Sequence, residues 1–229
     1  MRVTLVPTCL LLVVPLVAQL SVQPTIVDRE SGLAFPVTLT PPGSSTPHQI
    51  TGTATRERTI LRIKVYAYGL YIDAGAARTV FAAFAGKPAA ALERDPMFFH
   101  SLLDMRVPMT LRLVMARDVA GEAIAEAFDD ALTPRVGRVT PSRRQEASAA
   151  LERFRSYFNL NELARGTDIV FSCSSDGRLN TTVDTKARPE IRSPELCRAL
   201  FDVYLGDTPI STSGRRSLVR RFPALLAGQ

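Results

Sequence analysis

An arginine and two tyrosines lie in or beside a strand-like part of the chain. Residues 59–72 are rich in branched and aromatic side chains, which favours a long β-strand. Because side chains alternate between the faces of a strand, Tyr66 and Tyr68 would share a face, as would Arg56 and Arg58 if the strand is continuous. An inward arginine beside a tyrosine hydroxyl would offer several hydrogen-bond donors to a carboxylate or enolate oxygen in an apolar cavity. Composition alone favours the simpler interpretation that the tyrosines are strand formers on a half-buried surface.

Other familiar chemistries lack the residues that they need. The sequence has no nucleophile-elbow serine with a histidine and an acid, no P-loop, no dinucleotide fingerprint and no H-E-x-x-H motif. Its two histidines, His48 and His100, are isolated and have no carboxylate partner at metal-site spacing. No metal and no cofactor are therefore predicted.

The N-terminus has the pattern of a secretory leader. One arginine precedes an apolar run over residues 3–18, which is shorter than the roughly 20 residues that span a bilayer. This pattern predicts a signal peptide over residues 1–18 and a linker over residues 19–33, followed by one domain over residues 34–229. The protein is thus predicted to be exported, either periplasmic or secreted, with a retained N-terminal anchor as the alternative. No later stretch is apolar enough for a transmembrane helix.

Two cysteines, Cys173 and Cys197, follow the predicted leader. An oxidising compartment permits a disulfide between them. Because they form no cluster at metal-binding spacing, we interpret them first as ordinary core residues and second as a bridge.

The charge of the chain argues against a nucleic-acid partner. The net charge of +6 arises mainly from arginines spread along the sequence. No basic block alternates with aromatic residues, as nucleic-acid-binding surfaces require.

The order of predicted elements indicates an α+β fold. Strands are expected over residues 34–39, 59–72 and 107–115, and a hairpin over 169–183. Helices are expected over residues 74–85 behind Asp73, from Asp118 to just before Pro134, from Pro141, and from Pro194 behind Ser193. Strands and helices that segregate in this way predict an antiparallel sheet with helices on one face, and a cleft for an apolar ligand between the layers.

Several segments, taken in order, resemble the chalcone isomerase family. The similarity begins at Phe35-Pro36 and Pro41-Pro42-Gly43-Ser44 and continues with Gly52, Arg56 and the run Lys64-Val65-Tyr66-Ala67-Tyr68-Gly69-Leu70-Tyr71. It extends through residues 154–158, 199–211 and 218–226, and so covers nearly the whole predicted domain. The resemblance implies an open-faced β-sandwich, a large antiparallel sheet covered on one face by a layer of helices.

The resemblance also implies two kinds of function. Plant-type enzymes of the family close a chalcone into a flavanone with an early-strand Arg and Thr, a Tyr and an Asn from the middle helices, and a Thr or Ser near the late helix. Relatives that bind fatty acids keep the Arg and use a strand Tyr with it to hold the carboxylate.

Matched residue by residue, only the arginine of the enzyme set is kept. Arg56 matches that arginine, and Tyr66 stands at the strand threonine, as in the fatty-acid binders. Val203 falls at the Thr/Ser position, and a displaced Tyr157 or Asn159 is a conceivable stand-in for the missing pair. At the middle-helix positions the chain has Arg143, Arg144, Gln145 and Ala150.

We therefore expect a non-catalytic binder of a fatty acid or similar apolar carboxylate, of the exported bacterial type and closer to the fatty-acid-binding branch. Arg56, Tyr66 and Tyr68 are the predicted ligand-binding residues, and Arg56 and Tyr66 would be catalytic in an enzyme. The first alternative is an isomerase or intramolecular lyase acting on an enone-like substrate. The second is a non-catalytic interaction protein of the cell envelope, whose cleft is filled by side chains. The candidate cavity walls are Phe81, Phe84, Phe128 and Phe154, although residue type favours plain core as the interpretation of each.

Overall fold

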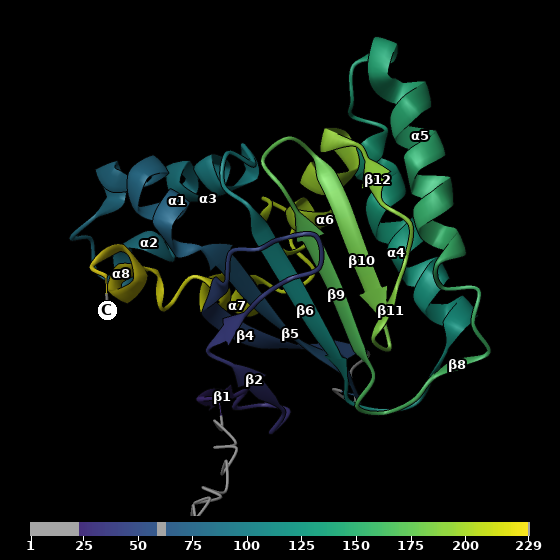
Figure 1. Cartoon of the computed structure of the whole chain (residues 1–229), viewed down its shortest axis with the longest axis horizontal. Helices are drawn as coiled ribbons and strands as arrows, with labels where there is room; N and C mark the ends of the chain where they lie inside the picture. The colour runs from purple at the N-terminus through teal and green to yellow at the C-terminus, as the bar shows by residue number, and fades with distance from the viewer. Residues whose placement is uncertain (1–22, 59–62, 229) are drawn as a thin grey trace, which may run out of the picture.

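The fold is built on one eight-stranded antiparallel sheet, seen in a computed structural model that describes residues 23–58 and 63–228 (Figure 1). The predicted signal peptide over residues 1–18 lies outside the described residues. The strands follow the order β11-β10-β9-β6-β5-β4-β3, with β12 beside β10. They are β3 (Thr38–Leu39), β4 (His48–Arg58), β5 (Ile63–Asp73), β6 (Met109–Met115), β9 (Asp168–Cys173), β10 (Arg178–Val183), β11 (Lys186–Ala187) and β12 (Ile191–Arg192).

The predicted run over residues 59–72 is therefore the second strand of a pair. Arg56 and Arg58 belong to β4, and β5 carries the tyrosines. In the antiparallel register Arg56 lies opposite Tyr66, and a bulge falls between Arg56 and Glu57. The hairpin predicted over residues 169–183 is confirmed as β9 and β10, with Leu179 opposite Cys173.

Helices cover one face of this sheet (Figure 1), as the α+β prediction required. Apolar side chains that alternate along β5, β6 and β9 point to that face and form the main core with the helices. The helices are α1 (Ala74–Val80), a 3₁₀ turn (Ala82–Phe84), α2 (Ala89–Leu92), α3 (Pro96–Leu103), α4 (Gly121–Val136), α5 (Pro141–Ser156), α6 (Pro194–Leu205), α7 (Thr212–Leu218) and α8 (Phe222–Leu226). A small pair, β7 (Val119–Ala120) and β8 (Glu162–Leu163), precedes α4 and follows α5.

Several helix ends match their sequence signals. The side chain of Asp73 accepts a hydrogen bond from Ala76 N and begins α1, and Ser193 does the same for Leu196 N at α6. The predicted helix over residues 74–85 is instead an α-helix followed by a 3₁₀ turn.

The expected bounds of α4 are wrong at both ends. Asp118 does not cap the helix, because its carboxylate accepts a hydrogen bond from the main-chain N–H of Arg165. The helix also continues through Pro134 to Val136. A proline so close to the C-terminal end removes a single main-chain hydrogen bond of the last turn, which the helix tolerates.

The other face of the sheet is partly covered by the segment predicted as a linker. Residues of β1 (Thr25–Val27) pair with β2 (Ala34–Pro36), so residues 25–33 are structured and that part of the linker prediction is wrong. Asp28 is buried, and its carboxylate accepts hydrogen bonds from Ser31 and, at 2.6 Å, from Thr55 Oγ1 of β4. These bonds lower the pKa of Asp28 although its burial opposes them. A second, smaller core around Phe35 and Tyr71 forms under this cover.

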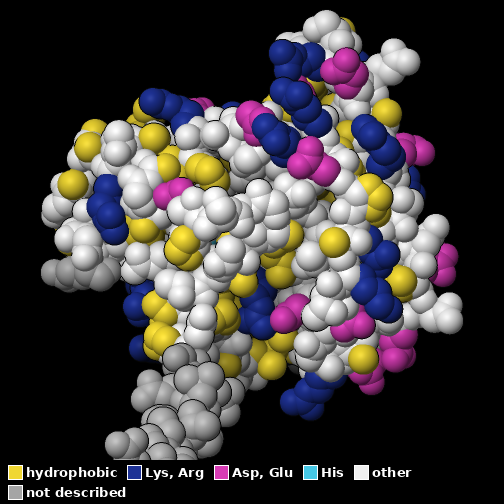
Figure 2. All heavy atoms as spheres, viewed as in Figure 1, with side chains coloured by type: hydrophobic (Ala, Val, Ile, Leu, Met, Phe, Trp, Pro, Cys, Tyr) yellow, Lys and Arg dark blue, Asp and Glu magenta, His cyan; other side chains and the backbone are white. Residues whose placement is uncertain are grey.

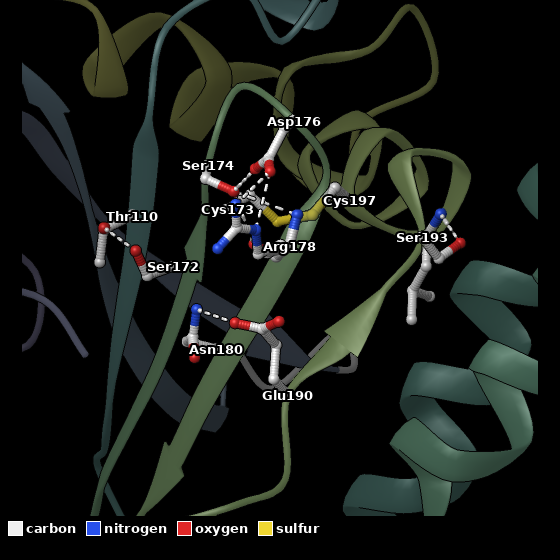
Figure 3. The surroundings of a disulfide bond; sticks show 11 residues. Thr110, Ser172, Cys173, Ser174, Asp176, Arg178, Asn180, Glu190, Ser193 and Cys197 are labelled. Carbon is white, nitrogen blue, oxygen red and sulfur yellow. Dashed lines mark hydrogen bonds and ion pairs between the residues drawn. A yellow bond between two sulfur atoms is a disulfide. The ribbon is translucent and has the colours of Figure 1, made fainter. Parts of the chain in front are cut away.

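Cys173 and Cys197 form a disulfide, and our first interpretation of them as ordinary core residues is wrong. Their sulfurs are 2.12 Å apart and both side chains are fully buried. The bridge ties the end of β9 to the first turn of α6, as Figure 3 shows. The alternation of β9 indicates correctly that Cys173 points to the core. The proximity of α6 is a tertiary property, which local sequence does not encode for two residues separated by 24 positions.

Charged side chains of both signs are interspersed on the face of the molecule shown in Figure 2. None of the helices within residues 23–58 and 63–228 has the length and apolar character of a membrane span.

Candidate functional site

A cavity of about 580 Å³ lies between the β4–β5 end of the sheet and helices α4 and α6. One wall is a stripe along α4, where residues three and four positions apart share a face. The opposite wall comes from β5, and α6 closes a third side. Its apolar lining consists of Ile63, Val65, Val119, Ala120, Ala123, Ile124, Ala127, Phe128, Ala131, Val203 and Ile210.

Arg56 lines this cavity from β4. Its Nη1 donates a 2.7 Å hydrogen bond to the main-chain oxygen of Ile210, which fixes the guanidinium at the cavity wall. Within residues 23–58 and 63–228, no carboxylate lies at ion-pair distance from it. Among the described residues the guanidinium therefore has no paired carboxylate, and the acidic groups of the lining, Asp118 and Asp130, form no ion pair with it.

Tyr66 lines the cavity next to Arg56, its partner in the strand register. The Tyr66 hydroxyl lies 3.3 Å from that of Tyr204, which reaches the cavity from α6. Burial raises the pKa of Tyr66, while the hydrogen bond with Tyr204 and the nearby Arg56 charge oppose this rise. Burial likewise raises the pKa of Tyr204 well above its ordinary value. Both phenols therefore keep their protons at neutral pH and serve as hydrogen-bond donors.

Tyr68, also predicted to contact the ligand, does not line the cavity. It is fully buried behind the cavity wall, where its ring centroid lies 4.9 Å from that of Tyr204. Its hydroxyl bonds with the Ser211 side chain, which together with Arg56 opposes the rise that burial causes in its pKa. Tyr68 thus supports the residues that do line the cavity.

Of the four predicted aromatic walls, only Phe128 lines the cavity. Phe154 packs against Phe128 in the core, with ring centroids 5.4 Å apart. Phe81 and Phe84 instead contact Phe98 in a separate aromatic cluster. Phe81 and Phe154 are buried core residues, and Phe84 is half-buried against the same core.

The helix that faces the cavity is α4, not the α5 segment that was matched to the enzymes' Tyr and Asn. Arg143, Arg144, Gln145 and Ala150 lie on α5 and are absent from the cavity lining, whereas Val203 is part of it. The possible stand-ins do not reach it either. The Tyr157 hydroxyl donates to the main-chain oxygen of Pro189, and Asn159 lines a separate hollow on the far side of α4.

The two ends of the cavity carry charged side chains. At one end Arg135 donates to Asp202 Oδ2 at 2.7 Å and also to the main-chain oxygens of Ala131 and Thr208. The other end, near the N-terminus of α4, is bordered by Arg58, Arg117 and Asp118. The lining along α4 runs from Ala123 to Arg135, which is about 18 Å at 1.5 Å per residue. The cavity is therefore elongated.

Sequence reasoning missed Tyr204 as a site residue. The apolar stripe of α6 predicts that this side chain points inward, but nothing local indicates a partner 138 positions away. Among the described residues, no group of three or more His, Cys, Asp or Glu side chains is arranged to hold a metal ion.

Comparison with known proteins agrees with the resemblance found in the sequence. A family model described as chalcone isomerase like matches residues 46–219. Fatty-acid-binding protein 2 of Arabidopsis thaliana is 28% identical over 207 residues, which cover 87% of this chain and 51% of that protein. The chain thus spans about half the length of this relative.

Enzymes are among the relatives as well. The chalcone–flavanone isomerase of Hordeum vulgare is 29% identical over 209 residues, covering 86% of this chain and 89% of the enzyme. The crystal structure of a fatty-acid binding protein of Arabidopsis thaliana superposes with a TM-score of 0.72 at 21% identity, covering 89% of this chain and all of the other. That likeness supports the fold prediction.

Proposed function

The chain belongs to the chalcone isomerase-like family, and on that premise we propose that it is a non-catalytic binder of a fatty acid or similar apolar carboxylate. The acid group would pair with Arg56 and accept a hydrogen bond from Tyr66, and the hydrocarbon chain would lie along α4. The relatives include proteins named for fatty-acid binding as well as isomerases, so the choice between them depends on the site.

The observation that carries the proposal is the position of Arg56 in the cavity. Arg56 is half-buried at the cavity wall and has no carboxylate partner among the described residues, so a ligand carboxylate could accept a charge-assisted hydrogen bond from it. The apolar wall would contribute about 25 cal/mol for each Å² of hydrocarbon that leaves water. An elongated amphiphile with one acid group satisfies both demands.

The same cavity argues against the isomerase alternative. The part of the wall contributed by Ala123, Ile124, Ala127, Phe128 and Ala131 of α4 carries no hydroxyl or amide donor, and the segment matched to the enzymes' Tyr and Asn lies on α5, outside the cavity lining. Loss of one positioned donor commonly lowers a rate by about 10²-fold or more. If the protein were a non-catalytic interaction protein, we would expect side chains to fill the cleft. The cavity beside Arg56 instead has a volume of about 580 Å³, which argues against this alternative.

Palmitate binding by the purified protein tests the proposal. Native mass spectrometry should detect a bound lipid acid, and calorimetry should give at least tenfold weaker palmitate binding for Arg56→Gln. Arg144→Gln is the matched control, because Arg144 is an exposed arginine of α5 away from the cavity. Equal palmitate affinity in wild type and Arg56→Gln would contradict the proposal. Turnover of a chalcone panel by the wild type would favour the isomerase instead.

We also propose that the protein is exported to the periplasm or secreted. The leader pattern over residues 1–18 motivates this, and the buried disulfide between Cys173 and Cys197 is of the kind that persists in oxidising compartments. Fractionation of cells expressing the full chain, with N-terminal sequencing of the product, tests it. Recovery of uncleaved protein in the cytoplasm with free thiols would contradict it.

A further inference from the structure

We propose that Tyr204 is a positioning residue that aims the hydroxyl of Tyr66 at the ligand's head group and so makes the cavity selective for ionised acids. This inference rests on the proposed function and adds the basis of its head-group specificity. It begins from the pair of hydroxyls 3.3 Å apart at the cavity wall.

Tyr204 is held firmly in its place. Its side chain is 1% exposed although it lines the cavity, and its ring packs on that of Tyr68 with a 4.9 Å centroid distance. Tyr68 is fixed in turn by the Ser211 side chain and by Gly214, where an added Cβ would lie 2.2 Å from the Tyr68 hydroxyl. The hydroxyl of Tyr204 therefore has little freedom to move away from Tyr66.

The proposed selectivity for ionised acids follows from the number of hydrogen-bond donors that the hydroxyls of Tyr66 and Tyr204 offer. Two phenol hydroxyls carry two hydrogens, and the bond between them uses one. When Tyr204 donates to Tyr66, the hydrogen of Tyr66 is left for the cavity, and donation through a chain of hydroxyls strengthens the outer donor. The main-chain oxygen of Ile210 is a nearby acceptor, but it already accepts a hydrogen bond from Arg56 Nη1.

The head-group site therefore presents donors and a positive charge. An ionised carboxylate accepts from Arg56 and Tyr66 at once and supplies the missing negative charge. A fatty alcohol cannot neutralise Arg56, and it would bring a hydroxyl hydrogen that competes for the few acceptors present. Sites built around buried polar groups reject analogues that leave those groups unpaired. We thus expect long-chain acids to bind more tightly than alcohols of equal length.

The test uses palmitate labelled with carbon-13 at its carboxyl, and hexadecanol as the neutral comparison. Tyr204→Phe removes one oxygen and keeps the ring that packs on Tyr68. We expect palmitate affinity to fall between about 3-fold and 10-fold, as for loss of one hydrogen bond, with hexadecanol affinity unchanged. The carbon-13 shift should also show a higher carboxyl pKa for bound palmitate, because the ionised form loses a donor. Tyr157→Phe is the matched control, since its hydroxyl bonds to Pro189 outside the cavity.

A double-mutant cycle separates positioning from packing. If Tyr204 acts through Tyr66, then Tyr204→Phe should have no further effect on palmitate affinity in a Tyr66→Phe background. An unchanged affinity and carboxyl titration in Tyr204→Phe, or additive effects in the double variant, would overturn the inference while Arg56→Gln still weakens binding. If Arg56→Gln has no effect either, the proposed function itself fails. Thermal unfolding of each variant shows whether any loss of binding reflects a loss of folded protein.

Discussion

The Nε of Arg135 lies 2.7 Å from Oδ2 of Asp202 and joins α4 to α6 at one end of the cavity. Because Arg135 also donates to the main-chain oxygens of Ala131 and Thr208, one side chain connects the two helices and the loop that follows α6. Both partners are mostly buried, with the Arg135 side chain 11% exposed. This contact helps to fix the separation between the walls.

Asp202→Asn should therefore reduce the free energy of unfolding by about 2 kcal/mol, because it leaves Arg135 buried without its counter-charge. Urea denaturation at neutral pH measures the change. Asp176→Asn is the comparison variant, because Asp176 and Arg178 form an exposed pair, seen in Figure 3. Its cost should be below about 1 kcal/mol. If both variants lose a similar free energy of unfolding, the contact between Arg135 and Asp202 contributes no more to stability than an exposed ion pair.

Removal of the disulfide should destabilise the fold without changing its topology. The bridge closes a loop of 24 positions, and the chain-entropy relation assigns about 3 kcal/mol to a loop of this size. Cys173→Ala/Cys197→Ala should lower the urea midpoint accordingly. The reductant dithiothreitol should then lower the midpoint of the wild type towards that of the double variant and leave the variant unaffected. Equal midpoints for oxidised wild type and variant would contradict the prediction.

Buried His48 should make stability depend on pH. It is 1% exposed, its Nδ1 lies 2.9 Å from Thr110 Oγ1, and burial lowers its pKa from 6.5 to about 4 against the opposing effect of Asp73. Between pH 6.5 and pH 4 the unfolded chain therefore binds a proton that the folded protein does not, so stability falls as the pH falls. The loss amounts to roughly 3 kcal/mol across this window.

Urea denaturation at a series of pH values tests the His48 prediction. His48→Gln should flatten the dependence in this window, whereas His100→Gln should keep it, because the His100 side chain is half exposed and lies 3.5 Å from that of the exposed Asp207. A His48→Gln protein with the full wild-type slope would assign the dependence to other groups.

Gly52 should be intolerant of any side chain. A Cβ there would lie 1.9 Å from the main-chain oxygen of Ser217, at the end of α7 where it packs on β4. Gly52→Ala should therefore destabilise the protein by more than about 2 kcal/mol, since backbone must move. Gly75→Ala is the control. Gly75 lies in α1, and a Cβ added there would have its nearest contact with the Asp73 side chain, at 3.3 Å. Alanine there should be neutral or stabilising. Thermal unfolding midpoints that fall equally in both variants would refute this.

The parts of the fold that follow from local chemistry could be predicted from the sequence. Alternation over residues 169–183 identified the hairpin, and the caps at Asp73 and Ser193 located two helix starts. Asp118 looked equally good as a cap, but its carboxylate is engaged by a main-chain N–H 47 positions away. A local signal fails where a distant group competes for the same atom.

The candidate site was predictable to the same extent. Arg56 and Tyr66 could be proposed together because neighbouring segments carry them, and they are register partners. Tyr68 shares the inward face with Tyr66, yet helices cover it and leave Tyr66 open to the cavity. Strand periodicity gives the face of a side chain, whereas its access to a cavity depends on what packs above it. For the same reason, sequence spacing could not reveal the hydroxyl of Tyr204 beside Tyr66.

Three small residues, Ala123, Ala127 and Ala131, follow one another at single-turn intervals along the cavity wall. Each alanine methyl group leaves space in the cavity that a larger side chain would fill. The length of cavity that stays open along α4 therefore depends on the size of the side chain at each of these three turns. We expect a leucine at any of these three positions to shorten the space along α4 while leaving Arg56 in place. If the proposed ligand lies along α4, single substitutions at these positions would therefore set the chain length that fits, without changing Arg56.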